Sequence, residues 1–541
     1  MRRNLHPGLL AAALALAAAT VPYASTLGGY FLGDDFGLVQ LFAAKPPLHF
    51  LRHFWTSFTE GIWGVTTDEL RPFTVLSYQL GMLGGVTSPV LQHAINVALH
   101  AATTLLVVVM ARRMGGVSWT AAAFSGGVFA LLPAHVETVV WITGRVDSIL
   151  ALSYGATLLA YAGWRQTGDR RLFATSLLLS VVTLYSKQSA LTLPATLLTF
   201  EWLFHPRETR RWWARVRPWL PHAALVAGML ALRFALFTSV VRARYLLSPS
   251  TPLRYLLMEG RYIQTVLLGA VRVGPDAPLP LQVLAALIGL GAVGAVAAVL
   301  WRHTWSPLAR AQRQYGALLF FGPTWWLITT APLLLAGYET ARFLYVPAVG
   351  LAIAAGLTLD LLTARYQAAS IGRRVTCAAA VVVLLGEVSA LRAGVGVWNR
   401  AGVISATMAA DVRREADAWP PGTLLILSPV VEPKAWDWAV PFVLQPPFAA
   451  RDLASHFVVV CTKPAYYNEF TWFTDMQARL EAWRSAPVTP VVAMVWNPAT
   501  GILSRHTEED RPGLAQRVRQ LGDARSEEEL KARLGRVLSE P

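Results

Sequence analysis

The sequence has few charged residues: only 15% of its 541 positions are Asp, Glu, Lys or Arg. In an ordinary soluble domain about one quarter of the residues are charged. Hydrophobic residues make up 54% of the chain, and the mean hydropathy is +0.44. This shortage of charge argues against a soluble enzyme, a disordered chain or a collagen.

Cysteine is also scarce. Cys377 lies in an apolar run and Cys461 in a polar tail, so no intramolecular disulfide is expected. The sequence has no CxxC pair or Cys/His cluster for a structural zinc ion. It also has no phosphate-binding glycine loop in a strand–turn–helix context, which argues against a soluble nucleotide substrate.

The chain contains long apolar runs instead. Eleven of them, many near the ~20 residues that cross a bilayer, predict a polytopic α-helical membrane protein. The first, residues 8–27, has the form of a signal peptide or of a first span, and we expect an uncleaved span because the polar loop behind it needs an anchor. The other ten lie near 93–111, 117–133, 148–164, 172–185, 189–204, 219–239, 280–301, 315–335, 343–363 and 376–396.

One further apolar segment, residues 253–273, carries four charged side chains, Arg254, Glu259, Arg261 and Arg272. A charge at the middle of a bilayer costs roughly 2.5–3.5 kcal/mol on insertion scales. We therefore expect this segment to lie on the membrane surface or to be re-entrant.

The distribution of charge predicts the orientation. Lys and Arg exceed Asp and Glu by 47 to 32, a net charge of +15. With eleven spans and the N-terminus inside, the expected cytoplasmic segments hold 18 basic and two acidic residues, as the positive-inside rule requires. The Ala/Arg/Leu-rich composition and short loops favour a bacterial inner membrane, with the periplasm outside.

The outer side collects charges of both signs at the ends of apolar runs, which indicates a polar site at that membrane face. The acidic residues there are Asp34, Asp35, Glu60, Asp68, Glu69, Glu137, Asp147, Glu259, Asp276 and Glu339. The basic residues there are Arg71, Arg145, Lys187, Arg242, Arg244 and Arg342.

The composition changes at Trp398. Residues 398–541 hold 16 basic and 17 acidic residues and predict a small soluble α/β domain on the outer side, after a transmembrane domain of residues 1–397. The tail has no 34-residue repeat. The elements expected in it are a helix at 400–418, strands at 423–427, 457–461 and 491–496, a turn at 497–501 and a charged helix at 525–538.

The acidic pair Asp34-Asp35 follows the first span. Adjacent carboxylates raise each other's pKa, and one of them could act as a general base. The alternative is an ordinary hydrated pair in a loop.

Four other clusters could bind an anion, and each has a structural alternative. Arg71 and Lys187 could hold a phosphate or only anchor the chain at the interface. In the loop with His135, Glu137, Arg145 and Asp147, the alternative is an ion pair from Arg145 to either acid. The spacing of His135 and Glu137 does not suit a metal on a helix, so no metal or other cofactor is expected, although a divalent ion stays possible. For Glu339 and Arg342 the alternative is a pair along one helix.

A lipid-linked phosphate suits these clusters, because they share one side of the membrane. Cations would hold the phosphate, apolar spans the lipid tail, and a carboxylate would activate an attacking hydroxyl. Two other readings stay open: a transporter or lipid flippase without transferase activity, and a non-catalytic scaffold that presents the tail. A transporter favours charges inside the membrane and paired broken spans, and we find no inverted repeat.

The motifs resemble those of the GT-C membrane glycosyltransferases, in particular the protein O-mannosyltransferase-like branch with the transmembrane-and-TPR mannosyltransferases and bacterial relatives. The matching segments, spread over most of residues 1–400, are GDDF (33–36), RPFTVLSY (71–78), His93, Asn96 and His100, PAHVETVVWITGRVD (133–147), SKQ (186–188) and RFLYVP (342–347). The chain departs from the branch at Leu132, Gln188 and Glu339, which bears on the donor sugar more than on the reaction type.

This resemblance implies an inverting transfer of a sugar, with mannose as the candidate, from a polyprenyl-phosphate donor to a protein, glycan or lipid acceptor, without nucleic acid. It implies that Asp34 or Asp35 is the catalytic base. It makes Lys187 and Arg342 the first candidates for binding the donor phosphate, with Arg71 and Arg145 next. The residues expected to bind substrate or support the site are His135, Glu137, Asp147, Glu339 and Tyr345.

Overall fold

The structure is a computed structural model of the chain. It describes residues 6–43, 45–62, 67–82, 87–205, 213, 216–237, 251–268, 278–288, 291, 313–336, 339–364, 366, 370–427, 442–452, 458–461, 472–485, 490–497 and 502–539. The last part of the expected span at 280–301, and Arg242, Arg244, Arg272 and Asp276, lie outside the described residues.

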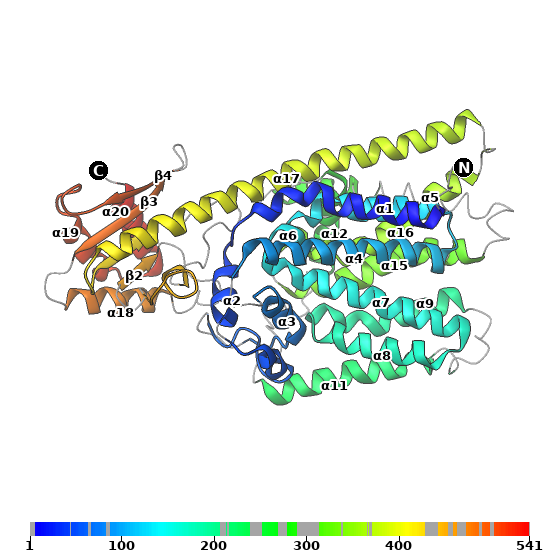
Figure 1. Ribbon diagram of the computed structural model, residues 1–541, viewed down its shortest axis with the longest axis horizontal. Coiled ribbons are helices and arrows are strands. Elements are labelled where there is room, and N and C mark those ends of the chain that lie inside the picture. Colours follow the sequence, from blue (N-terminus) through cyan, green and yellow to red (C-terminus); the bar gives the residue numbers. More distant parts are fainter. Residues whose placement is uncertain are drawn as a thin grey trace.

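Long helices run side by side along the long axis of the molecule, with the N-terminus at one end and a C-terminal sheet beyond the other (Figure 1). The α-helices of this part are α1 (Pro7–Thr20), α2 (Asp34–Ala43), α3 (Pro72–Leu80), α4 (Pro89–Gly115), α5 (Trp119–Leu131), α6 (Val136–Val140), α7 (Arg145–Thr167), α8 (Arg170–Leu184), α9 (Leu193–Phe204), α11 (Leu220–Leu236), α12 (Thr251–Leu268), α15 (Arg313–Thr330), α16 (Pro347–Ala364) and α17 (Ile371–Ala418). Short 3-10 segments include η1 (Val21–Gly28), η2 (Pro47–Phe54), η3 (Pro133–His135), η4 (Ile142–Gly144), η5 (Gln188–Thr192), η8 (Ala331–Ala336), η9 (Ala341–Leu344) and η10 (Phe442–Leu444).

Helix α4 shows how local sequence sets these boundaries. Ser88 precedes it, and its hydroxyl accepts a hydrogen bond from the backbone N–H of Leu91 at 3.5 Å. Pro89 occupies the first turn, where its missing N–H costs nothing. The helix ends at Gly115, and the next residue, Gly116, has a φ of 66°, the left-handed conformation that glycine adopts without strain.

Several helices have the length and composition of membrane spans. Within the described ranges, five are long and apolar enough to cross a bilayer, or six if α5 and the segment 133–140, bent by 51°, form one broken span. These helices confirm the prediction of a helical, multi-pass membrane protein. The number of eleven spans stays a prediction.

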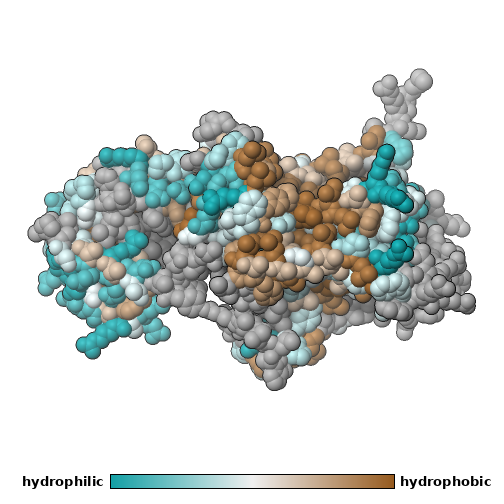
Figure 2. All heavy atoms as spheres, turned by 90° about the horizontal axis from the view of Figure 1, so that it is seen from below, coloured by the Kyte–Doolittle hydropathy of each residue, from teal (hydrophilic) through white to brown (hydrophobic). Residues whose placement is uncertain are grey.

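Part of the outer surface of the bundle is apolar, as lipid contact requires. Figure 2 shows hydrophobic side chains gathered over the middle of the helical part and hydrophilic ones over the C-terminal part and the opposite tip. Helix α17 contributes strongly to this surface, because only 6% of its most apolar window is buried. Among its exposed side chains are Val375, Val382 and Leu385.

Helix α12 covers most of the segment predicted to be surface-lying or re-entrant, and it is not one of the five candidate spans. Two of its charged side chains bond to protein groups. Trp326 donates its indole N–H to Glu259 at 2.7 Å, and Arg261 donates to Gln282 at 2.9 Å and to Glu339 at 2.8 Å. The helix contacts η3, η8 and η9, so its buried charges face the segments that carry the candidate site.

The C-terminal part contains a four-stranded sheet of order β2-β1-β3-β4. Its strands are β1 (Leu424–Leu427), β2 (Val458–Cys461), β3 (Val491–Asn497) and β4 (Ile502–His506), accompanied by α18 (Trp472–Arg484), α19 (Leu514–Arg519) and α20 (Glu527–Ser539). Strand β1 pairs in parallel with β2 and β3, and β4 pairs antiparallel with β3. The first three strands and the closing helix confirm the sequence prediction, whereas β4 was not predicted.

No linker separates the helical part from this sheet. Helix α17 is continuous for 48 residues and passes through the boundary expected at 397/398. One hydrophobic cluster joins α2 and α3 to the second half of α17 and one face of the sheet, and its members include Phe36, Tyr78, Met408, Val412, Leu425 and Val492. The sheet and the first loop therefore share a core at the same end of the molecule (Figure 1).

Packing of α15 against α16 provides a test of the bundle. A Cβ atom on Gly350 would lie 2.6 Å from the carbonyl oxygen of Gly322 and 2.9 Å from the indole of Trp325. We expect Gly350→Val to lower the stability of the detergent-solubilised protein by about 1–3 kcal/mol, because the two helices must move apart. Thermal unfolding followed by fluorescence measures this. Gly386→Val on α17, where a Cβ atom meets nothing within 4 Å, should leave the unfolding temperature unchanged.

Candidate active site

The acidic pair begins α2, at the end of the bundle that faces the sheet (Figure 1). Gly33, with a φ of 51°, turns the chain into this helix. Asp34 is partly exposed, whereas Asp35 is fully buried. The two carboxylates therefore have different surroundings.

Asp35 is fixed through both of its carboxylate oxygens. One accepts the backbone N–H of Leu32 at 3.0 Å. The other accepts the backbone N–H of Thr143 at 2.9 Å and its hydroxyl at 2.7 Å. Burial, the largest influence, raises the pKa of Asp35 to about 7, although these hydrogen bonds favour the charged form.

Thr143 connects the acidic pair to two other motifs. Its hydroxyl lies 3.0 Å from the hydroxyl of Tyr78, and because it donates its only proton to Asp35, Tyr78 must donate to it. Next to it, Gly144 has no room for a side chain, since a Cβ atom would lie 2.7 Å from the carbonyl oxygen of Thr138. The tight turn of η4 thus aims Thr143 at the carboxylate.

Arg145 lies at the centre of this arrangement and is fully buried. It donates to the side chain of Asn96 at 2.9 Å and to the carbonyl oxygens of Ser77 and Gln92 at 3.1 and 2.9 Å. Its guanidinium also lies over the ring of Tyr78, 4.7 Å from the centroid. Since its donors already bond to protein acceptors, Arg145 holds the motifs together, and we withdraw it as a phosphate contact.

Lys187 and Arg342 lie beside one aromatic ring. The ring of Phe343 is 4.6 Å from the ammonium of Lys187 and 5.6 Å from the guanidinium of Arg342. Lys187 pairs with Asp147 at 2.5 Å, and Arg342 pairs with Glu137 at 3.1 Å. Asp147 and Glu137 are the two acids that were expected as alternative partners of Arg145, so the alternative of an Arg145 ion pair is wrong.

A third cation stands close to Lys187. Burial is the main reason that the pKa of Lys187 is lowered, and the positive charges of Arg342 and Arg71 add to this effect while Asp147 opposes it. Arg71 pairs with Glu69 at 2.6 Å. The structure therefore brings together three of the four predicted phosphate-binding residues.

Arg233 was not predicted to belong to the site. It lies in the last turn of α11, is buried, and pairs with Asp68. It lines the same small pocket as Arg71, Lys187 and Gln188. The signal in the sequence was an arginine inside an apolar run, since such residues usually face a polar cavity or a partner.

Trp141 joins the acidic loop to the cations. Its indole N–H donates to the carbonyl oxygen of Leu32, next to Gly33 and the acidic pair, at 3.1 Å. The guanidinium of Arg342 lies over the same indole, 4.9 Å from the ring centroid. The carbonyl oxygen of Trp141 accepts the side-chain amide of Asn96 at 2.8 Å, which fixes its backbone.

The remaining predicted residues contact other protein groups. His135 and Tyr345 are fully buried, with ring centroids 4.5 Å apart, and His100 lies 2.8 Å from the hydroxyl of Tyr345. Glu339 pairs with Arg261 of α12 rather than with Arg342 along one helix. Within the described residues, the group with the spacing for a metal ion is His49, His53 and Glu60, outside this cluster. Its signal in the sequence is a His-x3-His pattern, which was not among the predicted sites.

Comparison with known proteins confirms the resemblance that the motifs indicate. The protein O-mannosyl-transferases Tmtc2 and Tmtc1 of Drosophila melanogaster are both 32% identical to this chain, over 187 and 205 residues. The human protein O-mannosyl-transferase TMTC1 is 30% identical over 169 residues. The alignments cover 32%, 35% and 30% of this chain but only 20%, 22% and 18% of the relatives. The chain thus spans about a fifth of the length of these proteins.

Two solved structures of membrane glycosyltransferases show a weaker likeness. The archaeal oligosaccharyltransferase AglB from Archaeoglobus fulgidus has a TM-score of 0.48 at 13% identity, over 94% of this chain and 74% of that one. The mycobacterial arabinofuranosyltransferase AftD has a TM-score of 0.47 at 15% identity, over 90% and 35%. Both scores lie under 0.5, so neither assigns an activity to this chain. No protein-family model matches it.

The position of Arg145 can be tested with a conservative change. We expect Arg145→Lys to lower the unfolding free energy in detergent by about 2–4 kcal/mol, because one ammonium cannot reach all of the carbonyl oxygens that the guanidinium serves. Thermal unfolding by circular dichroism measures the loss. Arg373→Lys, at an exposed position of α17, is the matched control and should unfold like the wild type. Equal stability of the two variants would contradict the central role of Arg145.

Proposed function

We propose that the protein is an inverting glycosyltransferase that moves a sugar from a polyprenyl-phosphate donor to an acceptor hydroxyl at the outer membrane face. The contact made by Trp141 carries this proposal. Its indole bonds to the acidic loop on one side and lies against Arg342 on the other. A carboxylate for the acceptor and cations for the leaving phosphate therefore belong to one site.

Asp34 is the residue that we assign as general base. Asp35 is buried and its two oxygens already accept three hydrogen bonds from Leu32 and Thr143, whereas Asp34 is partly exposed. A base has to reach the proton that it removes. Asp35 then acts as a positioning residue that holds the first turn of α2.

The reaction follows from these positions. The acceptor oxygen attacks the anomeric carbon and transfers its proton to Asp34. The bond from that carbon to the phosphate oxygen breaks on the opposite face, and the electron pair leaves with the lipid phosphate. Attack and departure on opposite faces invert the configuration.

Lys187, Arg342 and Arg71 would stabilise the charge that develops on the leaving phosphate. Each is already paired with a carboxylate, Asp147, Glu137 or Glu69. The pairs keep the cations charged and oriented at a partly buried site. The oxygens of the donor phosphate can take the place of these carboxylates or bind to the cations beside them. Phosphate is a good leaving group, so no general acid is needed.

Mannose and a protein acceptor are the candidates that the names of the relatives suggest. We further propose that the chain lies in a bacterial inner membrane, with the N-terminus in the cytoplasm. The acidic pair and the C-terminal sheet lie at the end of the bundle away from the N-terminus, which supports an outward-facing site (Figure 1).

Removal of the proposed base provides the first test. Asp34→Asn should reduce sugar transfer by about 10²-fold or more, the contribution of a positioned general base. Donor binding should be retained. Mass spectrometry of glycans in a deletion strain that carries each variant measures transfer, and binding of a labelled polyprenyl-phosphate sugar measures affinity.

Asp169→Asn is the control for this substitution. Asp169 caps α8 at the end of the helix away from Lys187, and asparagine caps a helix equally well. It should leave transfer unchanged. Undiminished transfer by Asp34→Asn would contradict the assignment of the base.

Phosphate binding provides the second test. Lys187→Met keeps the apolar stem of the side chain but removes its charge, and we expect the affinity for polyprenyl phosphate to fall about 10–100-fold, the worth of one charge-assisted hydrogen bond. Titration of the detergent-solubilised protein measures this. Lys531→Met on α20 should bind like the wild type, and an unchanged affinity of Lys187→Met would remove Lys187 from the phosphate site.

A further inference from the structure

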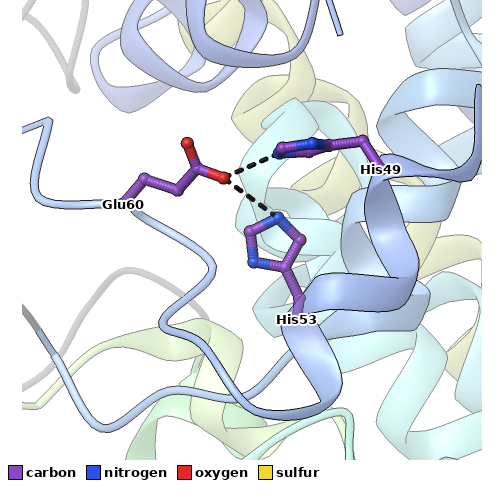
Figure 3. A group of neighbouring side chains, drawn as sticks. All are labelled: His49, His53 and Glu60. Atoms are coloured by element: carbon purple, nitrogen blue, oxygen red, sulfur yellow. Dashed lines mark hydrogen bonds and ion pairs between the residues drawn. The ribbon is translucent and has the colours of Figure 1, made fainter. Parts of the chain in front are cut away.

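Two histidines and a glutamate converge in the first loop, apart from the cations of the proposed site. His49 and His53 lie on η2 and point toward Glu60, which comes from the segment that follows (Figure 3). The possible ligand atoms of the three residues all lie within 4.8 Å of one another. Glu60 lies 2.7 Å from the Nε2 atom of His49 and 3.5 Å from the Nε2 atom of His53.

The hydrogen bonding of His53 leaves the lone pair of its Nε2 atom directed at Glu60. Its Nδ1 atom lies 3.1 Å from the carbonyl oxygen of Ser57, and a carbonyl can only accept, so Nδ1 carries the proton. The Nε2 atom of the neutral ring is then an acceptor. It is buried, and among the described residues it has no hydrogen-bond partner, although a carboxylate oxygen of Glu60 faces it. Two acceptors that face each other need a cation between them.

The backbone of Glu60 is unusual as well. With a φ of 47° it is the one residue other than glycine with a positive φ in the described ranges. A left-handed conformation costs a side-chain-bearing residue about 1–2 kcal/mol, and such strain is common at ligand sites. The strain turns the carboxylate toward the two histidines.

We propose that His49, His53 and Glu60 bind one Zn²⁺ ion. Two imidazole nitrogens and one carboxylate oxygen form an established zinc ligand set, whereas Mg²⁺ and Ca²⁺ prefer oxygen ligands. Ligands at about 2.0–2.2 Å from zinc in tetrahedral geometry lie about 3.3–3.5 Å apart. The His53–Glu60 separation of 3.5 Å already fits, and the 2.7 Å hydrogen bond of His49 would open slightly to admit the ion. The carbonyl oxygen of Ser57 is the outer-shell partner that zinc-binding histidines usually have.

Two cations compete with the metal for Glu60. Lys45 and Arg52 each lie 3.6 Å from its carboxylate. Their side chains are 34% and 50% exposed, so both can move into solvent when an ion binds. The bound ion would then link η2 to the segment that contains Glu60. This segment also contacts Glu69, because the backbone N–H of Phe58 donates to the carbonyl oxygen of Glu69 at 3.0 Å.

The test is the zinc content of the purified full-length chain, which is isolated with an affinity tag that contains no histidine. The protein is equilibrated with excess Zn²⁺ in detergent, passed over a desalting column and analysed by mass spectrometry of the metal. We expect one zinc ion per chain in the wild type and in His6→Gln, which changes an exposed histidine outside the cluster. In His49→Gln and in Glu60→Gln the bound zinc should be lost.

Co²⁺ provides a second readout that does not depend on how the variants fold. Bound to the wild type, it should give the visible absorption of a tetrahedral site, and one equivalent of Zn²⁺ should abolish this absorption. If the wild type retains no more zinc than His49→Gln does, or if Co²⁺ gives no such absorption, a second proton on His53 balances the charge of Glu60 and the proposal is wrong. Both measurements are independent of sugar transfer.

Discussion

Burial of the guanidinium of Arg145 is the interaction on which the site depends. A charge with no solvent contact is tolerable only if its donors are satisfied, and here they are satisfied by backbone carbonyl oxygens of α3 and α4 and by Asn96. Those partners lie 49 to 68 residues from Arg145 in the sequence. One side chain therefore fixes where α3, α4 and the start of α7 meet, and η4, which orients Asp35 through Thr143, is held in the same place.

The cations of the proposed phosphate site differ from Arg145 in their partners. Lys187 and Arg342 keep partly exposed side chains, Arg71 is buried, and each of the three is paired with an acid. Cations that stand close together repel each other, and the paired acids reduce this repulsion. Such an arrangement keeps positive charge available for an anion, whereas each nitrogen of Arg145 already donates to a protein acceptor. Burial and the kind of partner, and not the type of residue, thus distinguish the structural role of Arg145 from the role proposed for Arg342.

Much of this arrangement could be predicted from the sequence, and the limits have physical reasons. Apolar runs predicted the long helices, because hydropathy depends on local composition, and motifs predicted which loops carry the site. The partners of each charge could not be predicted: Asp147 lies two residues from Arg145 but pairs with Lys187, 40 residues away. Arg233 and the His49–His53 pair were missed because their sequence signals are weak alone, and only the fold brings Asp68 or Glu60 beside them. Strand β4 was missed because its pairing depends on β3.

The C-terminal part is coupled to the acidic loop through packing, not through a linker. Phe448 lies with its ring 5.4 Å from that of Phe31 and 4.9 Å from that of Phe36, on either side of Asp34 and Asp35 in the chain. Helix α17 adds a hydrogen bond from Ser405 to the carbonyl oxygen of Phe31 at 2.7 Å. Since close-packed aromatic rings cannot shift independently, a movement of the segment 442–452 against the bundle would disturb the first turn of α2. The C-terminal part and the acidic loop therefore share one packed core.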